Sequence, residues 1–108
     1  MYKFVTIYRR VDDEMMLEEF FSATHLPLAE QLPGLLRTGL TRIKSKPGGE
    51  SRFHMQYELY FADETSYLSA FLSEPGMQLL SVLQPWAAQK LITWFAGECW
   101  DEEFDEEE

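Results

Sequence analysis

Two kinds of hydrophobic spacing divide the chain into strands and helices. Residues 2–10 are rich in β-branched and aromatic side chains, and residues 52–62 alternate between apolar and polar positions, so both are predicted strands. Apolar residues recur at helical spacing from about residue 13 to the mid-twenties and again after Asp63. Residues 35–46 and 90–98 are the remaining predicted strands. The predicted order is β-α-β-β-α-β.

Prolines and glycines mark where these elements end. Pro27 disfavours α geometry in the residue before it, so we expect a kink there or a short second helical segment, ended by the Pro33-Gly34 pair. Pro75 is expected to start another short helix. A glycine-rich turn, PGGES, joins the two middle strands as an antiparallel hairpin.

The element order predicts a ferredoxin-like α+β fold, with a four-stranded antiparallel sheet covered by helices on one face. The strands carry apolar residues on both alternating sets, for example Phe4 and Tyr8 against Val5 and Ile7. A sheet that is apolar on both faces needs a second covering layer, and a second copy of the chain supplies one most simply. We therefore expect a homodimer.

Length and charge restrict the remaining possibilities. The 108 residues suffice for one domain, and the net charge of −10 comes mostly from residues 98–108, which hold eight of the 19 acidic groups and no base. We predict a domain over residues 1–97 and a solvated acidic tail over 98–108, which argues against nucleic-acid and anionic-membrane partners. A single cysteine, Cys99, allows no intramolecular disulfide, and no apolar run approaches 18 residues. These features predict a cytoplasmic protein.

The most informative polar residue is His25, which lies among apolar residues next to a proline. Imidazole titrates near neutral pH, so one hypothesis makes His25 a general acid or base, or a group that orients a substrate. A second makes it a structural residue that hydrogen-bonds a carbonyl freed by Pro27 and fixes the kink. A third makes it a metal ligand. The adjoining helix ends would shift its pKa in opposite directions, and the sequence does not decide between them.

Further candidates are aromatic. Tyr8 and Tyr57 are predicted to donate hydrogen bonds to a substrate oxygen, and three residues are predicted to contact an apolar substrate: Phe21, Trp86 and Trp94. For the tyrosines and tryptophans, the alternative is plain core packing.

Metal and cofactor sites are not expected. The second histidine, His54, belongs to the more polar set of its strand and is predicted on a solvated face or a dimer rim. No metal-ligand spacing, phosphate loop or dinucleotide fingerprint occurs, so we expect neither a metal nor a cofactor.

Several segments, taken in order, resemble the EthD family: FVTIYRR, then LEEFFSATHLPLAEQLPGL, then FLSEPGMQLL before an acidic end. The likeness covers about residues 2–97, and its most specific part is H-x-P-L followed by L-P-G-L, beginning at His25. This resemblance implies a dimeric α+β barrel, in which two sheets form a central barrel with helices outside and a pocket lies between sheet and helices.

The resemblance also implies a setting in small-molecule catabolism, since the family is associated with bacterial degradation of ethers, or in secondary metabolism. Cofactor-independent oxidation, isomerisation and cyclisation of an apolar or aromatic substrate all agree with a dry pocket and a positioned proton-transfer group. The alternatives are a non-catalytic small-molecule carrier and a purely structural dimer. A cavity beside His25 would discriminate among them.

Overall fold

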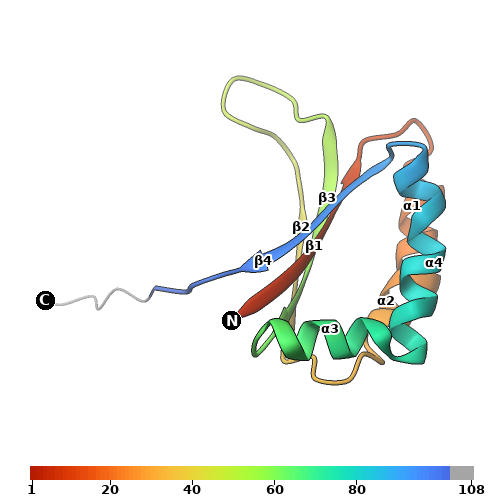
Figure 1. The fold of residues 1–108 in the computed structure, drawn as a ribbon. Coiled ribbons are helices and arrows are strands. Elements are labelled where there is room, and N and C mark those ends of the chain that lie inside the picture. The colour runs from red at the N-terminus through yellow and green to blue at the C-terminus, as the bar shows by residue number, and fades with distance from the viewer. Residues whose placement is uncertain (103–108) are drawn as a thin grey trace, which may run out of the picture.

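The computed structural model describes residues 1–102 and contains one four-stranded sheet. Its strands are β1 (Tyr2–Arg9), β2 (Arg37–Arg42), β3 (Phe53–Phe61) and β4 (Ile92–Glu98). They run in the order β2-β3-β1-β4, and every neighbouring pair is antiparallel. All helices lie on one side of this sheet (Figure 1). The predicted ferredoxin-like α+β fold is confirmed.

The helical layer has two parts. The first is a continuous run of α1 (Glu14–Phe20), the π-helix η1 (Phe21–His25) and α2 (Leu26–Ala29); the second is α3 (Glu64–Leu72) followed by α4 (Glu74–Ala88). Side-chain caps begin α1 and α3: Asp13 accepts from the Met16 amide at 3.0 Å, and Asp63 from the Ser66 amide at 2.8 Å. Such caps satisfy amides that have no partner within the helix.

Two predicted element lengths were wrong. The strand expected over residues 35–46 spans only Arg37–Arg42, because beyond it the chain turns back through a tight Lys46–Gly49 bridge. Gly48 and Gly49 adopt φ values of 94° and 145°, which favour glycine and end the ladder. The helix that begins at Glu74 and Pro75 is not short, since it runs for 15 residues.

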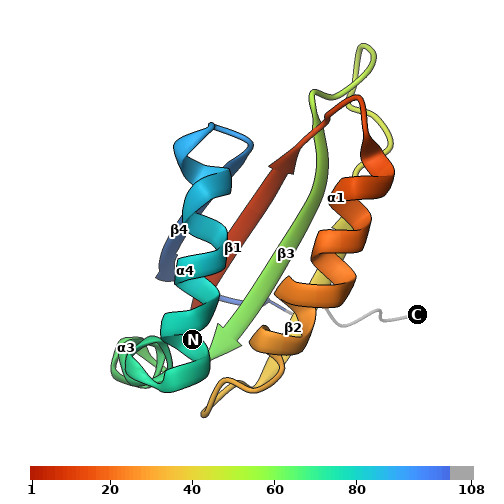
Figure 2. The same ribbon diagram turned by 90° about the vertical axis from the view of Figure 1, so that its right-hand side faces the viewer.

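The connection between α3 and α4 is very close. A Cβ atom at Gly76 would lie 2.2 Å from the carbonyl oxygen of Ala70 and 2.6 Å from Cα of Phe71. Only glycine permits this approach without movement of the backbone. The two helices therefore meet as an elbow at one end of the sheet (Figures 1 and 2).

The second face of the sheet is mixed rather than uniformly apolar. Val5, Ile7 and the half-exposed Phe95 lie on it, as predicted for β1 and β4. On β3 the same face carries Glu58, which forms an ion pair with Lys3 at 2.7 Å. The doubly apolar pattern thus holds for two strands and fails for β3.

The residues after β4 lie across this uncovered face. The Cys99 amide donates to the Met1 carbonyl at 3.0 Å, and Asp101 pairs with Arg37 of β2 at 2.6 Å. Glu98, predicted to open the acidic tail, still belongs to β4, and the part of that tail beyond Glu102 lies outside the described residues.

Within residues 1–102, the structure contains no helix with the length and apolar character needed to span a membrane.

Candidate functional site

The π-helix η1 places His25 against the sheet. In it the Leu26 amide donates to the Phe21 carbonyl five residues earlier, which is the bond that defines a π turn. Pro27 has no amide hydrogen and would break an ordinary α ladder at this point. The wider turn absorbs the predicted kink without ending the helical run, and π turns of this kind often occur at functional sites.

The π turn also explains which side chains face the core. Four residues at intervals of four are almost completely buried: Leu17, Phe21, His25 and Ala29. In a regular α-helix, positions four apart rotate by about 40° per step and leave a common face. A wider turn in the middle takes up part of this rotation, so that His25 remains aligned with Leu17 and points at the sheet.

Three polar side chains of the sheet meet His25 in the interior. The Tyr8 hydroxyl lies 2.5 Å from Nδ1 of His25, and the Tyr57 ring centroid lies 5.1 Å from the imidazole. Thr6 is the register partner of Tyr57 on the adjacent strand and faces the same side. All four residues are at most 1% exposed. We call His25, Tyr8, Tyr57 and Thr6 the interior polar cluster.

Burial keeps the titratable members of this cluster neutral. It lowers the pKa of His25 to about 3, so the imidazole carries no charge at neutral pH. It raises the pKa of Tyr8 well above its usual range and that of Tyr57 to about 12. The neighbouring Thr38 hydroxyl opposes part of the rise in the pKa of Tyr57. The cluster therefore offers neutral hydrogen-bonding groups rather than charges.

Three buried polar atoms of the cluster have no hydrogen-bond partner among the described residues: His25 Nε2, the Tyr57 hydroxyl and Thr6 Oγ1. Leaving one such atom unpaired costs about 1–3 kcal/mol, so most native cores avoid it. A phenol is a strong donor and an imidazole nitrogen a good acceptor, so Tyr8 is best placed to donate to Nδ1. That arrangement leaves the Nε2–H of His25 as a donor without an acceptor.

The kink hypothesis for His25 was wrong in its mechanism. Its hydrogen-bond partner is the Tyr8 hydroxyl, and Nε2 reaches no backbone carbonyl among residues 1–102. The sequence suggested that the end of one helix or the start of another would shift the pKa of His25. Neither is present at this residue, because the helical run continues through it. Burial alone shifts the pKa.

A surface groove approaches the cluster between the two parts of the helical layer. One hollow of about 470 Å³ is lined by α1 and η1 residues together with Trp86, and an adjoining one of about 230 Å³ by Met16 and residues from Pro85 to Leu91. Figure 2 shows α1 and α4 as the two helices between which this groove lies, with β1 and β3 behind them. Neither hollow is lined by His25.

Aromatic rings separate this groove from the cluster. Trp86 lies 4.7 Å from Phe20 and 5.4 Å from Tyr8 between ring centroids, the second contact being edge-on. Trp86 is held near the end of α4 by a turn in which Lys90 adopts φ 61° and the Leu91 amide donates to the Trp86 carbonyl. Trp86 and Phe20 thus form the wall between groove and interior.

The predicted site residues do not all meet. The structure brings together His25, Tyr8, Tyr57, Phe21 and Trp86 through ring contacts of 4.9–6.2 Å. Trp94 is the register partner of Thr6 on β4 and lies 6.2 Å from Phe4 between ring centroids, but no ring contact joins it to His25, Tyr8 or Tyr57.

Sequence reasoning overlooked Thr6 and Phe20. A hydroxyl at a core-facing strand position between Phe4 and Tyr8 was the available signal for Thr6. Phe20 had been assigned only to the apolar stripe of the first helix.

His54 was placed wrongly by the alternation of its strand. The β1–β3 register shifts where Tyr8 pairs with Met55 and Arg9 with Phe53, so His54 is the extra residue of a bulge. Its side chain reaches α1, where Nε2 lies 2.8 Å from Glu18, and it is only 9% exposed.

Glu18 links this residue to β2. It also accepts two bonds from Arg42, which with His54 lower its pKa to about 2. Among residues 1–102, no group of three or more His, Cys, Asp or Glu side chains is placed to hold a metal ion. The contacts of His54 therefore join α1 to the sheet.

Comparison with known proteins gives the following relationships. No family model matches the chain. A curated relative, an uncharacterised 11.0 kDa protein in the thcB-thcC intergenic region of Rhodococcus erythropolis, is 24% identical over 98 residues, which is 91% of this chain and 95% of the relative. The crystal structure of an ethyl tert-butyl ether D (EthD) family protein from Bacillus halodurans C-125 is 32% identical, with a TM-score of 0.85, over 93% of this chain and 99% of that protein.

More distant solved structures share the fold. SnoaB, a cofactor-independent oxygenase from Streptomyces nogalater, is 17% identical with a TM-score of 0.64 and covers 97% of each chain. A dimeric ferredoxin-like protein of unknown function from Jannaschia sp. CCS1 is 18% identical with a TM-score of 0.60, over 91% of this chain and 97% of that one. At these identities the similarity extends to architecture alone.

Proposed function

Because the chain belongs to the EthD family, we propose that it acts on a small, largely apolar molecule that binds between sheet and helices at the interior polar cluster. The observation that carries the proposal is the pair of buried atoms, His25 Nε2 and the Tyr57 hydroxyl, that face the interior without partners. Both atoms carry hydrogen-bond donors, and a ligand oxygen is an acceptor that such donors bond. The cofactor-independent oxygenase activity of SnoaB, which shares the fold, agrees with a role in small-molecule catabolism or biosynthesis.

The neutral state of the cluster suggests the kind of chemistry. A carbonyl or phenol whose oxygen gains negative charge during isomerisation, cyclisation or oxidation is stabilised by preorganised neutral donors in a dry site. Nε2–H of His25 is such a donor, and Tyr8 holds the imidazole through Nδ1. Full proton transfer from Tyr8 would leave a buried phenolate, which its raised pKa opposes. We infer that His25 and Tyr57 polarise the oxygen and that Tyr8 is a positioning residue.

Ligand entry requires the aromatic wall to move. The groove beside α1 and η1 ends at Trp86 and Phe20, which separate it from Tyr8. Rotation of the Trp86 side chain would join groove and interior without unfolding a helix. In this scheme Phe21 and Trp86 contact the apolar part of the ligand, and Trp94 does not.

A matched pair of probes tests the proposal. 1-Naphthol and naphthalene differ by one hydroxyl; binding to every variant is measured by isothermal titration calorimetry, and in proteins that retain His25 it is also followed through the imidazole ¹⁵N signals of that residue. We expect naphthol to shift the Nε2 signal saturably and to bind at least ten times more tightly than naphthalene, because only naphthol supplies an oxygen. His25→Gln and Tyr57→Phe should remove most of this difference, whereas His54→Gln should preserve it. Equal affinity for both probes, or no binding, would contradict the proposed oxygen site.

A structural dimer without ligand is the second candidate function. It is favoured by the burial of His25, which is 0% exposed and touches none of the surface hollows described above. On this view, His25→Gln alters stability and leaves every probe titration unchanged, an outcome that separates the two functions.

We further propose that the protein forms a homodimer through the face of the sheet that carries Val5, Ile7 and Phe95. Phe95 is 50% exposed at this face, and structural neighbours of this chain are described as dimeric. Phe95→Glu should convert a dimer to a monomer in sedimentation velocity at micromolar concentration. Leu72→Glu, which adds the same charge at a 75% exposed site on α3, should not. A monomeric wild-type protein would overturn this proposal.

A further inference from the structure

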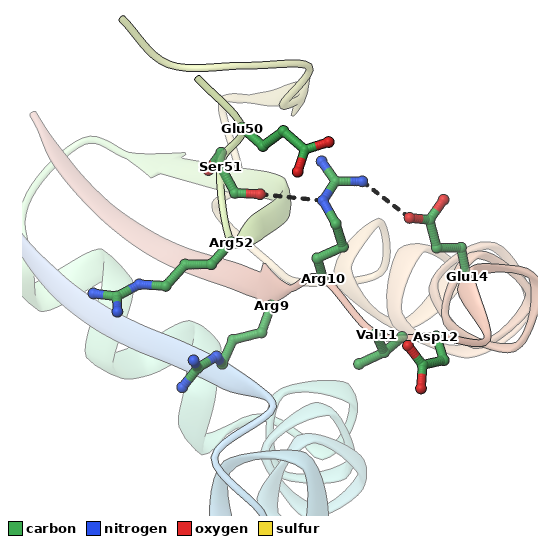
Figure 3. A pocket seen from close by; sticks show the side chains of 8 residues that line it. All are labelled: Arg9, Arg10, Val11, Asp12, Glu14, Glu50, Ser51 and Arg52. Atoms are coloured by element: carbon green, nitrogen blue, oxygen red, sulfur yellow. Dashed lines mark hydrogen bonds and ion pairs between the residues drawn. The ribbon is translucent and has the colours of Figure 1, made fainter. Parts of the chain in front are cut away.

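A further hollow lies at the C-terminal end of β1, where this strand meets the start of α1 and the loop before β3. Its volume is about 630 Å³, and it is lined by Arg9, Arg10, Val11, Asp12, Glu14, Glu50, Ser51 and Arg52 (Figure 3). Three of the nine basic residues of a strongly acidic chain therefore line it, together with three acidic residues. None of the interior polar cluster lines this hollow, so it is a separate site.

Arg10 has a structural task in this hollow. Its guanidinium donates to Glu14 at 2.9 Å, to the Ser51 carbonyl at 3.2 Å and to the Ile43 carbonyl at 3.1 Å. These bonds tie α1 to both ends of the loop between β2 and β3. Its donors are therefore occupied, and its charge is balanced by Glu14.

Arg9 and Arg52 are different. Neither forms an ion pair within residues 1–102, whereas Lys3, Arg10, Arg37 and Arg42 each pair with a carboxylate. Figure 3 shows the Arg9 and Arg52 side chains extending in the same direction on one side of the hollow, with Asp12 and Glu14 on the other side. Glu50 also lines the hollow, and the Glu14 carboxylate is engaged by Arg10. Two guanidinium groups that are unpaired within the described residues raise the electrostatic potential on their side, which an anion bound there would lower.

The backbone at both arginines is held in place. The Arg9 amide donates to the Leu91 carbonyl at 2.9 Å, and the Arg52 carbonyl accepts from the Arg10 amide at 2.7 Å. Ser51 Oγ accepts from the Phe53 amide at 3.1 Å, which leaves its own hydroxyl hydrogen free to donate. The hollow thus presents two guanidinium forks and one hydroxyl on a fixed frame.

We propose that this hollow binds the carboxylate or phosphate group of a small free anion, held jointly by Arg9 and Arg52 with Ser51 as a further donor. The planar guanidinium fork matches both kinds of oxyanion and binds them through paired hydrogen bonds. Because the site is separate from the interior cluster, the proposal does not depend on the function assigned to His25.

Citrate and inorganic phosphate are the probes, titrated at constant ionic strength against chloride. We expect the Nε–Hε signals of Arg9 and Arg52 to shift saturably with either probe and not with chloride. Arg52→Gln should weaken binding at least tenfold, and Arg52→Lys should weaken it measurably because the fork is lost while the charge remains. Lys44→Gln, the same charge change at an exposed position of the adjoining loop, should alter affinity less than twofold.

Two further variants, one that lacks the residues beyond Glu102 and one with His25→Gln, make the result decisive. The sequence beyond Glu102 contains five more acidic residues, and their removal tests whether they compete with an added anion for the two arginines. Binding of citrate only after these residues are removed would assign the hollow to the chain's own carboxylates and overturn the proposal. Shifts that do not saturate, or that Lys44→Gln weakens as much as Arg52→Gln does, would also overturn it. His25→Gln should leave these titrations unchanged, so failure here is distinct from failure at the interior cluster.

Discussion

The helix-covered face of the sheet has two aromatic halves that differ in one respect. Under α3, five rings pack at 4.8–6.3 Å with no buried polar atom left unpaired among them: Phe4, Phe61, Tyr67, Phe71 and Trp94. Under η1 and α4, rings at similar spacing enclose a histidine, two tyrosines and a threonine, three of whose polar atoms lack partners.

This difference separates the packed α3 half from the proposed binding site on the same face of the sheet. Aromatic content alone does not mark a site, because the α3 half is as aromatic as the other and only stabilises the fold. The η1 half gives up stability by burying polar atoms, which is typical of regions retained for chemistry. Substitutions in each half test this contrast between apolar packing and buried polar atoms.

Phe71→Ala should have the largest effect. Phe71 is 7% exposed and contacts three rings of the α3 half, so its removal should lower the free energy of unfolding by about 4 kcal/mol. Leu72→Ala, one residue later and 75% exposed, should change it by less than about 0.5 kcal/mol. Urea denaturation measures both, and comparable losses would mean that the α3 half is not packed as described.

Tyr8→Phe should cost about 2 kcal/mol. It removes the bond to His25 and leaves Nδ1 as another buried atom without a partner. The melting temperature and urea midpoint report the loss. An unchanged melting temperature and urea midpoint would show that the Tyr8–His25 bond does not stabilise the folded protein in solution.

The stability of the protein should depend on pH in a window set by His25. The unfolded histidine binds a proton near pH 6.5 and the folded one near 3, so the unfolded chain holds more protons between these values. Stability should therefore fall as the pH decreases below 6.5, with a limiting slope of about 1.4 kcal/mol per pH unit.

Glu18 does not interfere above pH 5. Its pKa moves from 4.5 when unfolded to about 2 when folded, so the stability it contributes is lost only as the pH falls below 4.5. Urea titrations from pH 6.5 to 5 isolate His25, and His25→Gln should abolish the slope. Persistence of the slope in that variant would assign it to another group.

Thr6→Val should raise stability by about 1 kcal/mol. The change replaces an unpartnered hydroxyl by a methyl group of similar size in a buried position. Replacing a buried threonine by valine where the hydroxyl has a hydrogen-bond partner would instead lower the free energy of unfolding. A loss of stability at Thr6 would therefore show that its hydroxyl is satisfied in solution.

Removal of residues 99–108 should have the smallest effect, less than about 1 kcal/mol. Within the described part of this segment, the contacts identified are one backbone bond to Met1 and an exposed Asp101–Arg37 ion pair, and exposed pairs contribute little. Differential scanning calorimetry checks the result. A fall of many degrees would show that the segment is docked more extensively.

Much of the architecture follows from local patterns along the chain. The alternation of Phe53 to Phe61, and the helical spacing that begins near residue 13 and again after Asp63, predicted elements that the structure confirms. His25 was singled out because a titratable ring on an apolar helical stripe is unusual, and Tyr8 and Tyr57 because a tyrosine hydroxyl can donate to a substrate oxygen; the roles of all three stay predictions. The shortness of β2 was missed because residues 43–46 continue the strand-like sequence, whereas the ladder with β3 ends at the Arg42–Met55 pair.

The candidate site was less predictable for a physical reason. The side to which His54 points depends on a bulge set by register with β1, and the separation of Trp94 from His25 depends on where α3 and α4 cross the sheet. Neither property is encoded in the spacing of a single segment.

The sequence by itself determined the order of elements, their phase and the presence of a histidine on a buried stripe, because these depend on neighbours a few residues away. Only the tertiary structure decided that Tyr8 would bond that histidine, that its other nitrogen would be buried without a partner, and that burial would hold its pKa near 3. Hydrogen-bond partners and desolvation arise between segments that are distant along the chain.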